Sequence, residues 1–201
     1  MTAISFDLTW DYRCPFARFA HQHVLAGLRD GAEWDVRFVP FSLRQMHVEE
    51  GDPDVWEEPT SDSGLLALEV AVAVRDHQPD AFLAVHEKLF DARHTEDRDI
   101  RERDVLREIL VEGGADPDDA FGRVDSGEAR KVVQAEHEAL VRDHECWGVP
   151  TFIIGENAVF VRLMDGPGDD PVASRIAIDR VLDMLTGWPQ LNEFKHTSLS
   201  R

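Results

Sequence analysis

Cysteine is scarce in this sequence, and long apolar runs are missing. Only Cys14 and Cys146 occur in 201 residues, and two cysteines in a chain of this length do not form a disulfide framework. No stretch reaches the ~20 apolar residues of a membrane span, and the first residues lack the basic region and apolar run of a secretory signal. We therefore expect a cytoplasmic protein, because thiols are kept reduced there and a redox cysteine suits a reductase or transferase.

Positive charge is also in short supply. Lysine and arginine number 21 against 40 aspartates and glutamates, which gives a formal net charge of −19. The electrostatic field of a protein with this charge repels phosphate backbones and anionic lipid surfaces, so we expect neither a nucleic-acid nor a membrane partner. The content of 43% hydrophobic and 30% charged residues is typical of a globular chain. The length allows one domain with an inserted subdomain.

The spacing between apolar residues changes twice within the first forty residues. Residues 4–9 alternate apolar and polar side chains, as a half-buried strand does. After Cys14 the apolar residues recur at three- and four-residue steps, with Pro15 at the first helical position and Gly31 able to end the helix. Residues 34–39 alternate again. Strand, helix and strand form a βαβ unit, so we expect two parallel strands.

The middle of the chain predicts helices only. A loop at residues 46–62 is followed by helical periodicity, whose first segment Ser63 can cap, and no strand signal appears before about residue 150. The expected helices lie at residues 65–76, around 82–90, around 105–110, from 117 onward and at about 127–146.

Strand signals return near the end. Residues 151–154 and 158–161 flank a turn at Gly155, which predicts an antiparallel hairpin, and residues 172–185 predict a last helix. This order predicts an α/β fold with an inserted all-helical subdomain. We expect a first part at residues 1–45, the helical insertion at 46–139 and a second part at 140–201.

Cys14 lies where the first strand gives way to the first helix. The helix N-terminus carries roughly half a positive charge, which favours the thiolate, the nucleophilic form of cysteine. Arg13 and Arg18 flank Cys14, and their charges would lower its pKa further. Ala17 occupies the position of the second cysteine of a C-x-x-C motif. We interpret Cys14 as a redox nucleophile without its usual partner; the alternative is an inert buried thiol.

Several segments match one known family. They are residues 11–16, 89–92 with 99–100 and 105–106, 113–116 and 147–152. On these segments the chain resembles the DsbA-like branch of the thioredoxin superfamily, which also holds kappa-class glutathione transferases and 2-hydroxychromene-2-carboxylate isomerases. Residues 188–195 resemble the ending of actinobacterial members that use mycothiol. The resemblance implies a thioredoxin-like fold with a helical insertion.

The same resemblance implies roles for particular residues. Cys14 would be the nucleophile, and Pro150 would follow a cis peptide bond, for which an ordinary trans turn is the alternative. The backbone of Val149 would then pair with a substrate backbone as an added strand does. Since Ala17 cannot resolve a mixed disulfide, a low-molecular-weight thiol, mycothiol or glutathione, would do so as a co-substrate. No permanently bound cofactor is expected.

Three aromatic residues, Trp10, Phe16 and Trp147, are expected to surround the Cys14 pocket. They could stack on an aromatic substrate or shield the sulfur from water, and core packing is the alternative.

Other titratable residues are expected to have no catalytic role. Cys146 is expected to pack inward rather than to act as a distant resolving cysteine. His21 lies two turns beyond Cys14 on the same helix and is expected on the surface rather than as a base. Metal binding is not expected, because His144, Glu145 and Cys146 form only a loose cluster.

The sequence is therefore interpreted as that of a thiol–disulfide oxidoreductase, or thiol-dependent reductase, with one nucleophilic cysteine. Its expected partners are small-molecule thiols or disulfides, and a homodimer is left open. Two alternatives remain. One is a glutathione-transferase-like or isomerase-like enzyme, in which Cys14 stabilises the sulfur of a bound thiol. The other is a non-catalytic family member that acts as a binding protein.

Overall fold

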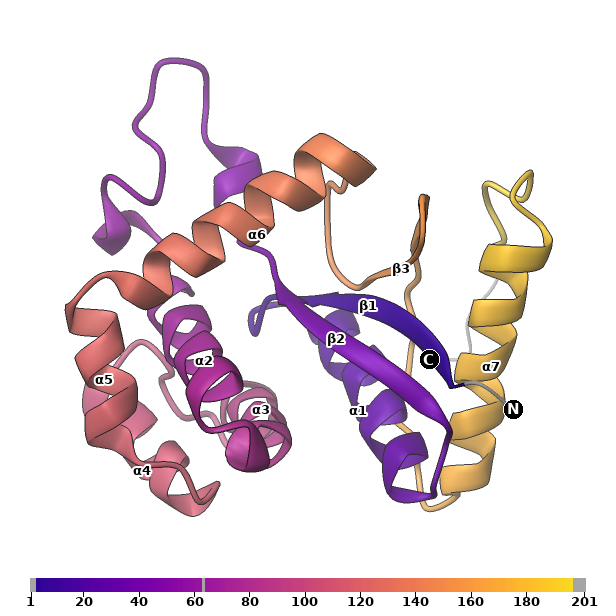
Figure 1. Ribbon diagram of the computed structural model, residues 1–201, viewed down its shortest axis with the longest axis horizontal. Helices are drawn as coiled ribbons and strands as arrows, with labels where there is room; N and C mark the ends of the chain where they lie inside the picture. The colour runs from indigo at the N-terminus through magenta and orange to yellow at the C-terminus, as the bar shows by residue number, and fades with distance from the viewer. Residues whose placement is uncertain (1–2, 63, 197–201) are drawn as a thin grey trace.

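The computed structural model describes residues 3–62 and 64–196 and has a four-stranded mixed sheet among helices (Figure 1). The strand order is β2-β1-β3-β4. The strands are β1 (Ile4–Trp10), β2 (Trp34–Pro40), β3 (Thr151–Ile154) and β4 (Asn157–Phe160).

The predicted βαβ unit is confirmed. β1 and β2 pair in parallel from Ile4 with Trp34 through Trp10 with Pro40. The helix between them, α1 (Pro15–Arg29), ends before Gly31, whose φ of 79° suits a residue without a side chain. The predicted hairpin is also confirmed, because β3 pairs antiparallel with β4 and with β1.

The predicted helices are present with small shifts at their ends. The chain forms α2 (Leu65–His77), α3 (Pro79–His94), α4 (Arg103–Glu112), α5 (Pro117–Asp125), α6 (Glu128–His144) and α7 (Pro171–Gly187). Two short 3₁₀ helices, η1 (Gln45–His47) and η2 (Pro59–Ser61), lie in the segment predicted as loop. Ser63, the predicted cap of the first of these α-helices, lies outside the described residues, and Gly64 precedes α2.

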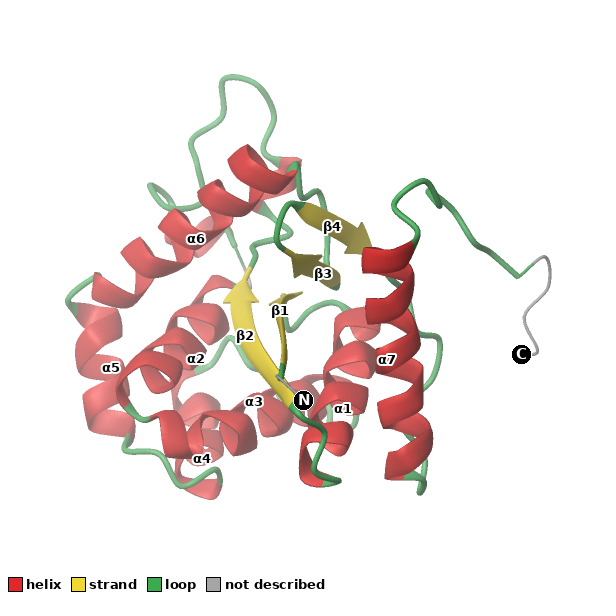
Figure 2. Cartoon of the chain, turned by 45° about the vertical axis from the view of Figure 1, so that its right-hand side comes forward, coloured by secondary structure: helices red, strands yellow, loops and turns green. Residues whose placement is uncertain are grey.

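The helices form two groups beside the sheet (Figures 1 and 2). α2 to α5 form one group and α1 and α7 form the other, with α3 in contact with α1. α6 leads from the first group back towards β3. This is a thioredoxin-like fold with helices inserted between β2 and β3. The domain division at residues 45 and 139 stays a prediction.

Candidate active site

Cys14 caps the first helix. Its backbone is extended, with φ −88° and ψ 115°, and Pro15 takes the first helical position. The backbone N–H of Ala17 donates to the Cys14 Sγ at 3.4 Å. Because the free N–H groups of a helix N-terminus point at the capping side chain, the sulfur sits where negative charge is best stabilised on this helix.

The turn before β3 lies directly against this sulfur. The Val149–Pro150 peptide bond is cis, and the Cys14 thiol donates to the Val149 carbonyl at 3.3 Å. Two bonds hold the turn in place: the Thr151 N–H donates to the Thr9 hydroxyl at 2.8 Å, and the Thr151 hydroxyl donates to the Gly148 carbonyl at 2.8 Å. Segments 135 residues apart in sequence thus meet at one sulfur atom.

The expectation of a lowered thiol pKa is wrong for this conformation. Burial raises the pKa of Cys14 above its usual range, since the side chain is only 8% exposed. The N–H groups of Ala17 and Phe16 oppose this shift in pKa, the Asp11 carboxylate adds to it, and Arg162 opposes it. The resting sulfur is therefore a thiol whose proton is held by the Val149 carbonyl.

The two flanking arginines serve other partners. Arg13 pairs with the buried carboxylates of Asp11 at 2.9 Å and Asp62 at 3.1 Å. Arg18 reaches α3, where it pairs with Asp91 at 3.2 Å and donates to Thr95 at 2.6 Å. Their charges are compensated by these carboxylates, which explains why neither arginine lowers the Cys14 pKa as predicted.

The three predicted pocket aromatics lie in different surroundings. Trp10 is fully buried and packs on Tyr12 and His86, so it belongs to the core. Phe16 is half-buried. Trp147 is 63% exposed, and its ring centre lies 4.5 Å from that of Phe160. Phe16 and Trp147 can therefore contact a ligand, whereas Trp10 has no exposed surface with which to do so.

Arg162 is a site residue that the sequence analysis missed. The register of the hairpin places it beside Pro150, because the Val161 N–H donates to the Pro150 carbonyl at 3.1 Å. Its guanidinium lies 5.3 Å from the ring centre of Phe16 and 5.9 Å from that of Phe160. The sequence does indicate this position through the predicted hairpin. In an antiparallel hairpin, the residues that follow the second strand lie opposite those that precede the first, and here the latter include Pro150.

His21 is buried, so the prediction of a surface position is wrong. Its Nε2 contacts the Thr9 carbonyl at 3.1 Å, and its Nδ1 contacts the Nε2 of His86 at 2.8 Å. The Nδ1 of His86 contacts the Tyr12 hydroxyl at 2.7 Å. A polar partner from α3, 65 residues away, makes burial of this side chain tolerable.

The proton positions along this series of hydrogen bonds follow from the Thr9 carbonyl, at which the series ends. A carbonyl only accepts, so His21 donates from Nε2 to Thr9 and accepts at Nδ1 from His86. His86 in turn accepts at Nδ1 from the Tyr12 hydroxyl. Burial lowers the pKa of His21 to about 3 and lowers that of His86 well below its usual range, so both rings are neutral donors and acceptors. These hydrogen bonds connect α1 and α3 to Tyr12, which lies two residues before Cys14.

Cys146 packs inward, as predicted. It is 4% exposed, and burial raises its pKa to about 11. Both cysteines are free. Within the described residues, no three side chains of His, Cys, Asp or Glu converge as a metal site would require. Of the helices in that same part of the chain, none is long and apolar enough to cross a bilayer.

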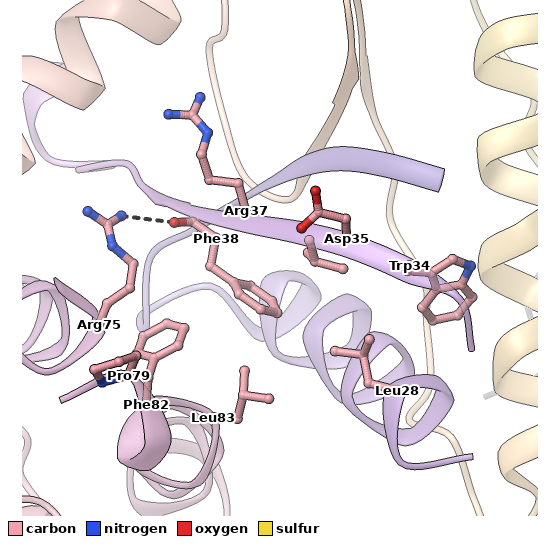
Figure 3. Close-up of a pocket in the computed structure, with 10 residues that line it drawn as sticks. Leu28, Trp34, Asp35, Arg37, Phe38, Arg75, Pro79, Phe82 and Leu83 are labelled. Carbon is pink, nitrogen blue, oxygen red and sulfur yellow. Dashed lines mark hydrogen bonds between the residues drawn. The ribbon is translucent and has the colours of Figure 1, made fainter. Parts of the chain in front are cut away.

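An open hollow of about 510 Å³ lies along β2, away from the residues described above (Figure 3). Trp34, Phe38 and Phe82 contribute to its apolar wall, and Arg75 donates to the Phe38 carbonyl at 2.9 Å across it. None of the candidate site residues lines this hollow. It is not part of the candidate active site.

One comparison with known proteins identifies a family. The family model described as a DSBA-like thioredoxin domain matches residues 7–173. A search of curated proteins found no match.

Solved structures share the fold at low identity. MdbA, a thiol-disulfide oxidoreductase from Actinomyces oris, is 18% identical with a TM-score of 0.59, and the match covers 92% of this chain and 81% of that one. The cytosolic disulfide reductase DsbM from Pseudomonas aeruginosa with GSH is 18% identical with a TM-score of 0.61, covering 89% and 99%. A 2-hydroxychromene-2-carboxylate isomerase is 14% identical with a TM-score of 0.63, covering 90% and 97%.

Proposed function

We propose that this chain, which belongs to the family of DSBA-like thioredoxin domains, is a thiol–disulfide oxidoreductase whose nucleophile is Cys14. One observation carries the proposal. The Cys14 sulfur caps a helix and lies 3.3 Å from the carbonyl of Val149, the residue before the cis-linked Pro150. A disulfide held along the Val149 backbone would therefore have one of its sulfurs next to a cysteine at a helix N-terminus.

The proposed first step forms a mixed disulfide. The Cys14 thiol loses its proton to solvent, and the thiolate attacks one sulfur of a bound disulfide. A new S–S bond forms to Cys14, the old S–S bond breaks, and its electron pair leaves on the second sulfur as a thiolate. The backbone of Val149 would orient the disulfide by pairing with it as a neighbouring strand.

The proposed second step uses an external thiol. Ala17 occupies the place of a resolving cysteine and is fully buried, and the thiol of Cys146 is buried with a raised pKa. A low-molecular-weight thiolate would attack the mixed disulfide, and Cys14 would leave as a thiolate and regain its proton. The oxidised product is then the mixed disulfide of that thiol with the substrate fragment, and Cys14 is restored.

The raised thiol pKa makes the Val149 carbonyl part of this proposal. The carbonyl accepts the Cys14 proton and would also be an acceptor for a substrate N–H. Competition for this acceptor would weaken the bond that favours the neutral thiol, and so lower the pKa of Cys14 when the site is filled.

The co-substrate and the compartment stay parts of the proposal. Glutathione is supported by the structure of DsbM with GSH, and mycothiol by the likeness of residues 188–195 to actinobacterial endings. We favour a cytoplasmic enzyme that acts on small-molecule thiols or disulfides. The net charge of −19 argues against nucleic-acid or anionic membrane partners.

Mass spectrometry of the intact protein tests the proposal. After incubation with glutathione disulfide or mycothiol disulfide, we expect the mass to increase by one thiol unit, and peptide mapping should place the adduct on Cys14. A Cys146→Ser variant should form the same adduct, because Cys146 is buried. An adduct only on Cys146, or none at all, would remove the nucleophile on which the proposal depends.

A second candidate is favoured by the resting state of the sulfur. A thiol that donates its proton to a carbonyl is a hydrogen-bond donor as well as a potential nucleophile. Cys14 could therefore stabilise the sulfur of a bound thiol in a transferase-like or isomerase-like reaction without forming a bond to it. That enzyme would turn over its substrate in the presence of a thiol and would show no adduct on Cys14. A non-catalytic binding protein would show neither turnover nor adduct.

A further inference from the structure

Arg162, whose charge opposes the rise in the Cys14 pKa, lies in the loop after β4, which leads to α7 (Figure 2). Arg162 directly follows Val161, whose N–H is bonded to the Pro150 carbonyl, so it is placed beside the cis turn. Asp165 lies three residues after Arg162, and its carbonyl accepts a hydrogen bond from the Nε2 of His23 at 3.2 Å. The Nδ1 of His23 accepts from the Ser174 hydroxyl at 3.0 Å. His23 of α1 thus holds the loop that carries Arg162 and also contacts Ser174 of α7.

Arg162 differs from the other arginines around Cys14. Arg13 and Arg18 are each paired with aspartates. Arg162 is exposed, and within the described part of the chain no carboxylate lies within 4.0 Å of its guanidinium. Other basic side chains of the described residues, Arg180 among them, also lack such a partner, but Arg162 is the one whose charge acts to lower the pKa of Cys14.

The aromatic rings beneath Arg162 hold it in place and leave its edge open. The guanidinium lies 5.3 Å from the ring centre of Phe16 and 5.9 Å from that of Phe160, and Trp147 packs on Phe160. Rings that contact one face of a guanidinium restrict its rotation without using its N–H donors. Those donors stay available to bind a planar anion such as a carboxylate in a bidentate manner.

We propose that Arg162, supported by Phe16 and Phe160, is a subsite for the carboxylate of the low-molecular-weight disulfide or thiol that reacts at Cys14. This proposal rests on the proposed function, because it assigns a chemical class to the co-substrate of the same site. It favours thiols that carry a carboxylate, such as glutathione, over uncharged thiols such as mycothiol. The overall negative field would otherwise repel such anions.

The test compares two disulfides that differ in charge. Dithiobis(nitrobenzoate) carries two carboxylates and dithiodipyridine carries none. When Cys14 attacks, the first releases the thionitrobenzoate thiolate and the second releases thiopyridone, and each product is followed by its absorbance. The rates are measured for an Arg162→Gln variant in a Cys146→Ser background, so that only Cys14 reacts. Arg180→Gln is the matched control, because Arg180 is exposed on α7 and has no carboxylate within 4.0 Å in the described residues.

Two effects of Arg162 are separated by this design. Loss of its charge should raise the Cys14 pKa and slow both disulfides equally, since both need the thiolate. Loss of the subsite should slow the anionic disulfide further, by about threefold, a size typical of an exposed ion pair. The additional slowing should shrink as salt is added, and Arg180→Gln should change neither rate by a comparable factor.

Each outcome decides one question. Additional slowing confined to the anionic disulfide supports the subsite. Equal slowing of both disulfides, or no slowing, overturns the subsite and leaves the proposed function standing. If Cys14 of the parent protein reacts with neither disulfide, the proposed function itself is overturned, and the subsite with it.

Discussion

A Cys14→Ser variant should lose thiol–disulfide exchange while keeping its fold. Serine preserves the size of the side chain and can still cap α1 by accepting the Ala17 N–H. Its hydroxyl is a far weaker nucleophile than a thiolate, so the rate should fall by about three orders of magnitude or more. The measurement is the rate of reduction of a small disulfide with glutathione or mycothiol as the reductant, together with the circular dichroism spectrum.

The matched control is Cys146→Ser. Cys146 is buried, lacks a helix N-terminus and has a pKa raised to about 11, so its loss should leave the exchange rate within about twofold of the parent. If Cys14→Ser kept the parent activity while Cys146→Ser lost it, the site would have been assigned to the wrong cysteine. If both variants kept full activity, the activity would not be a cysteine reaction.

Mild acid should destabilise this protein through its buried histidines. Burial lowers the pKa of His21 to about 3 and that of His137 to about 4, and lowers the pKa of His86 well below the ordinary value of 6.5. Between these values and 6.5 the unfolded chain binds more protons than the folded one. Stability is therefore unaffected above pH 6.5 and falls as the pH drops below it.

The size of this effect is large for a single domain. At about pH 5 each of the three histidines should lower the free energy of unfolding by about 2 kcal/mol, against a usual total of roughly 5–15 kcal/mol. Acid also reduces the negative charge of the 40 acidic side chains. The weaker repulsion among them raises the stability of the folded state and so acts in the opposite direction. A variant is therefore needed to isolate the contribution of one histidine.

His137→Phe provides that comparison. His137 packs against Phe41 and Trp56, with ring centres 4.4 and 5.6 Å away, and its Nδ1 has no hydrogen-bond partner. Phenylalanine should keep the packing and remove the buried base. From urea unfolding, the loss of stability between pH 8 and pH 5 should be smaller than in the parent by about 2 kcal/mol.

The exposed His47 supplies the control for this experiment. His47→Gln is the matched substitution, because it also removes one histidine but at an exposed position where no buried base is lost. If His137→Phe lost as much stability in acid as the parent, His137 would not be a buried neutral base. The acid sensitivity would then have another source.

Much of the fold could be predicted because it is set by local periodicity. The apolar alternation in β1 and β2, and the three- and four-residue steps in α1, each reflect which face of the element is buried. The order of these elements then limits the topology, since a strand, a helix and a strand of these lengths form a parallel unit. Cys14 and Pro15 at the start of α1 could be identified in the same way.

The predictions that were wrong concern residues whose contacts come from distant parts of the sequence. The direction of the Cys14 pKa shift cannot be predicted from the sequence, chiefly because burial raises this pKa. The sequence also does not reveal that Arg13 is bound by Asp62 and Arg18 by Asp91. His21 was placed on the surface because its partner, His86, comes from another helix. Burial and charge pairing are tertiary properties, and a spacing rule along one helix does not contain them.

Release of the Cys14 mixed disulfide by added thiol tests the central claim most directly. The adduct with glutathione is isolated on the Cys146→Ser variant, free glutathione is added, and the adduct mass is followed with time. We predict that the adduct is lost at a rate proportional to the concentration of added thiol, and that the free Cys14 thiol and glutathione disulfide appear together. An adduct that persists in excess thiol, or that is lost equally fast without it, would contradict the account.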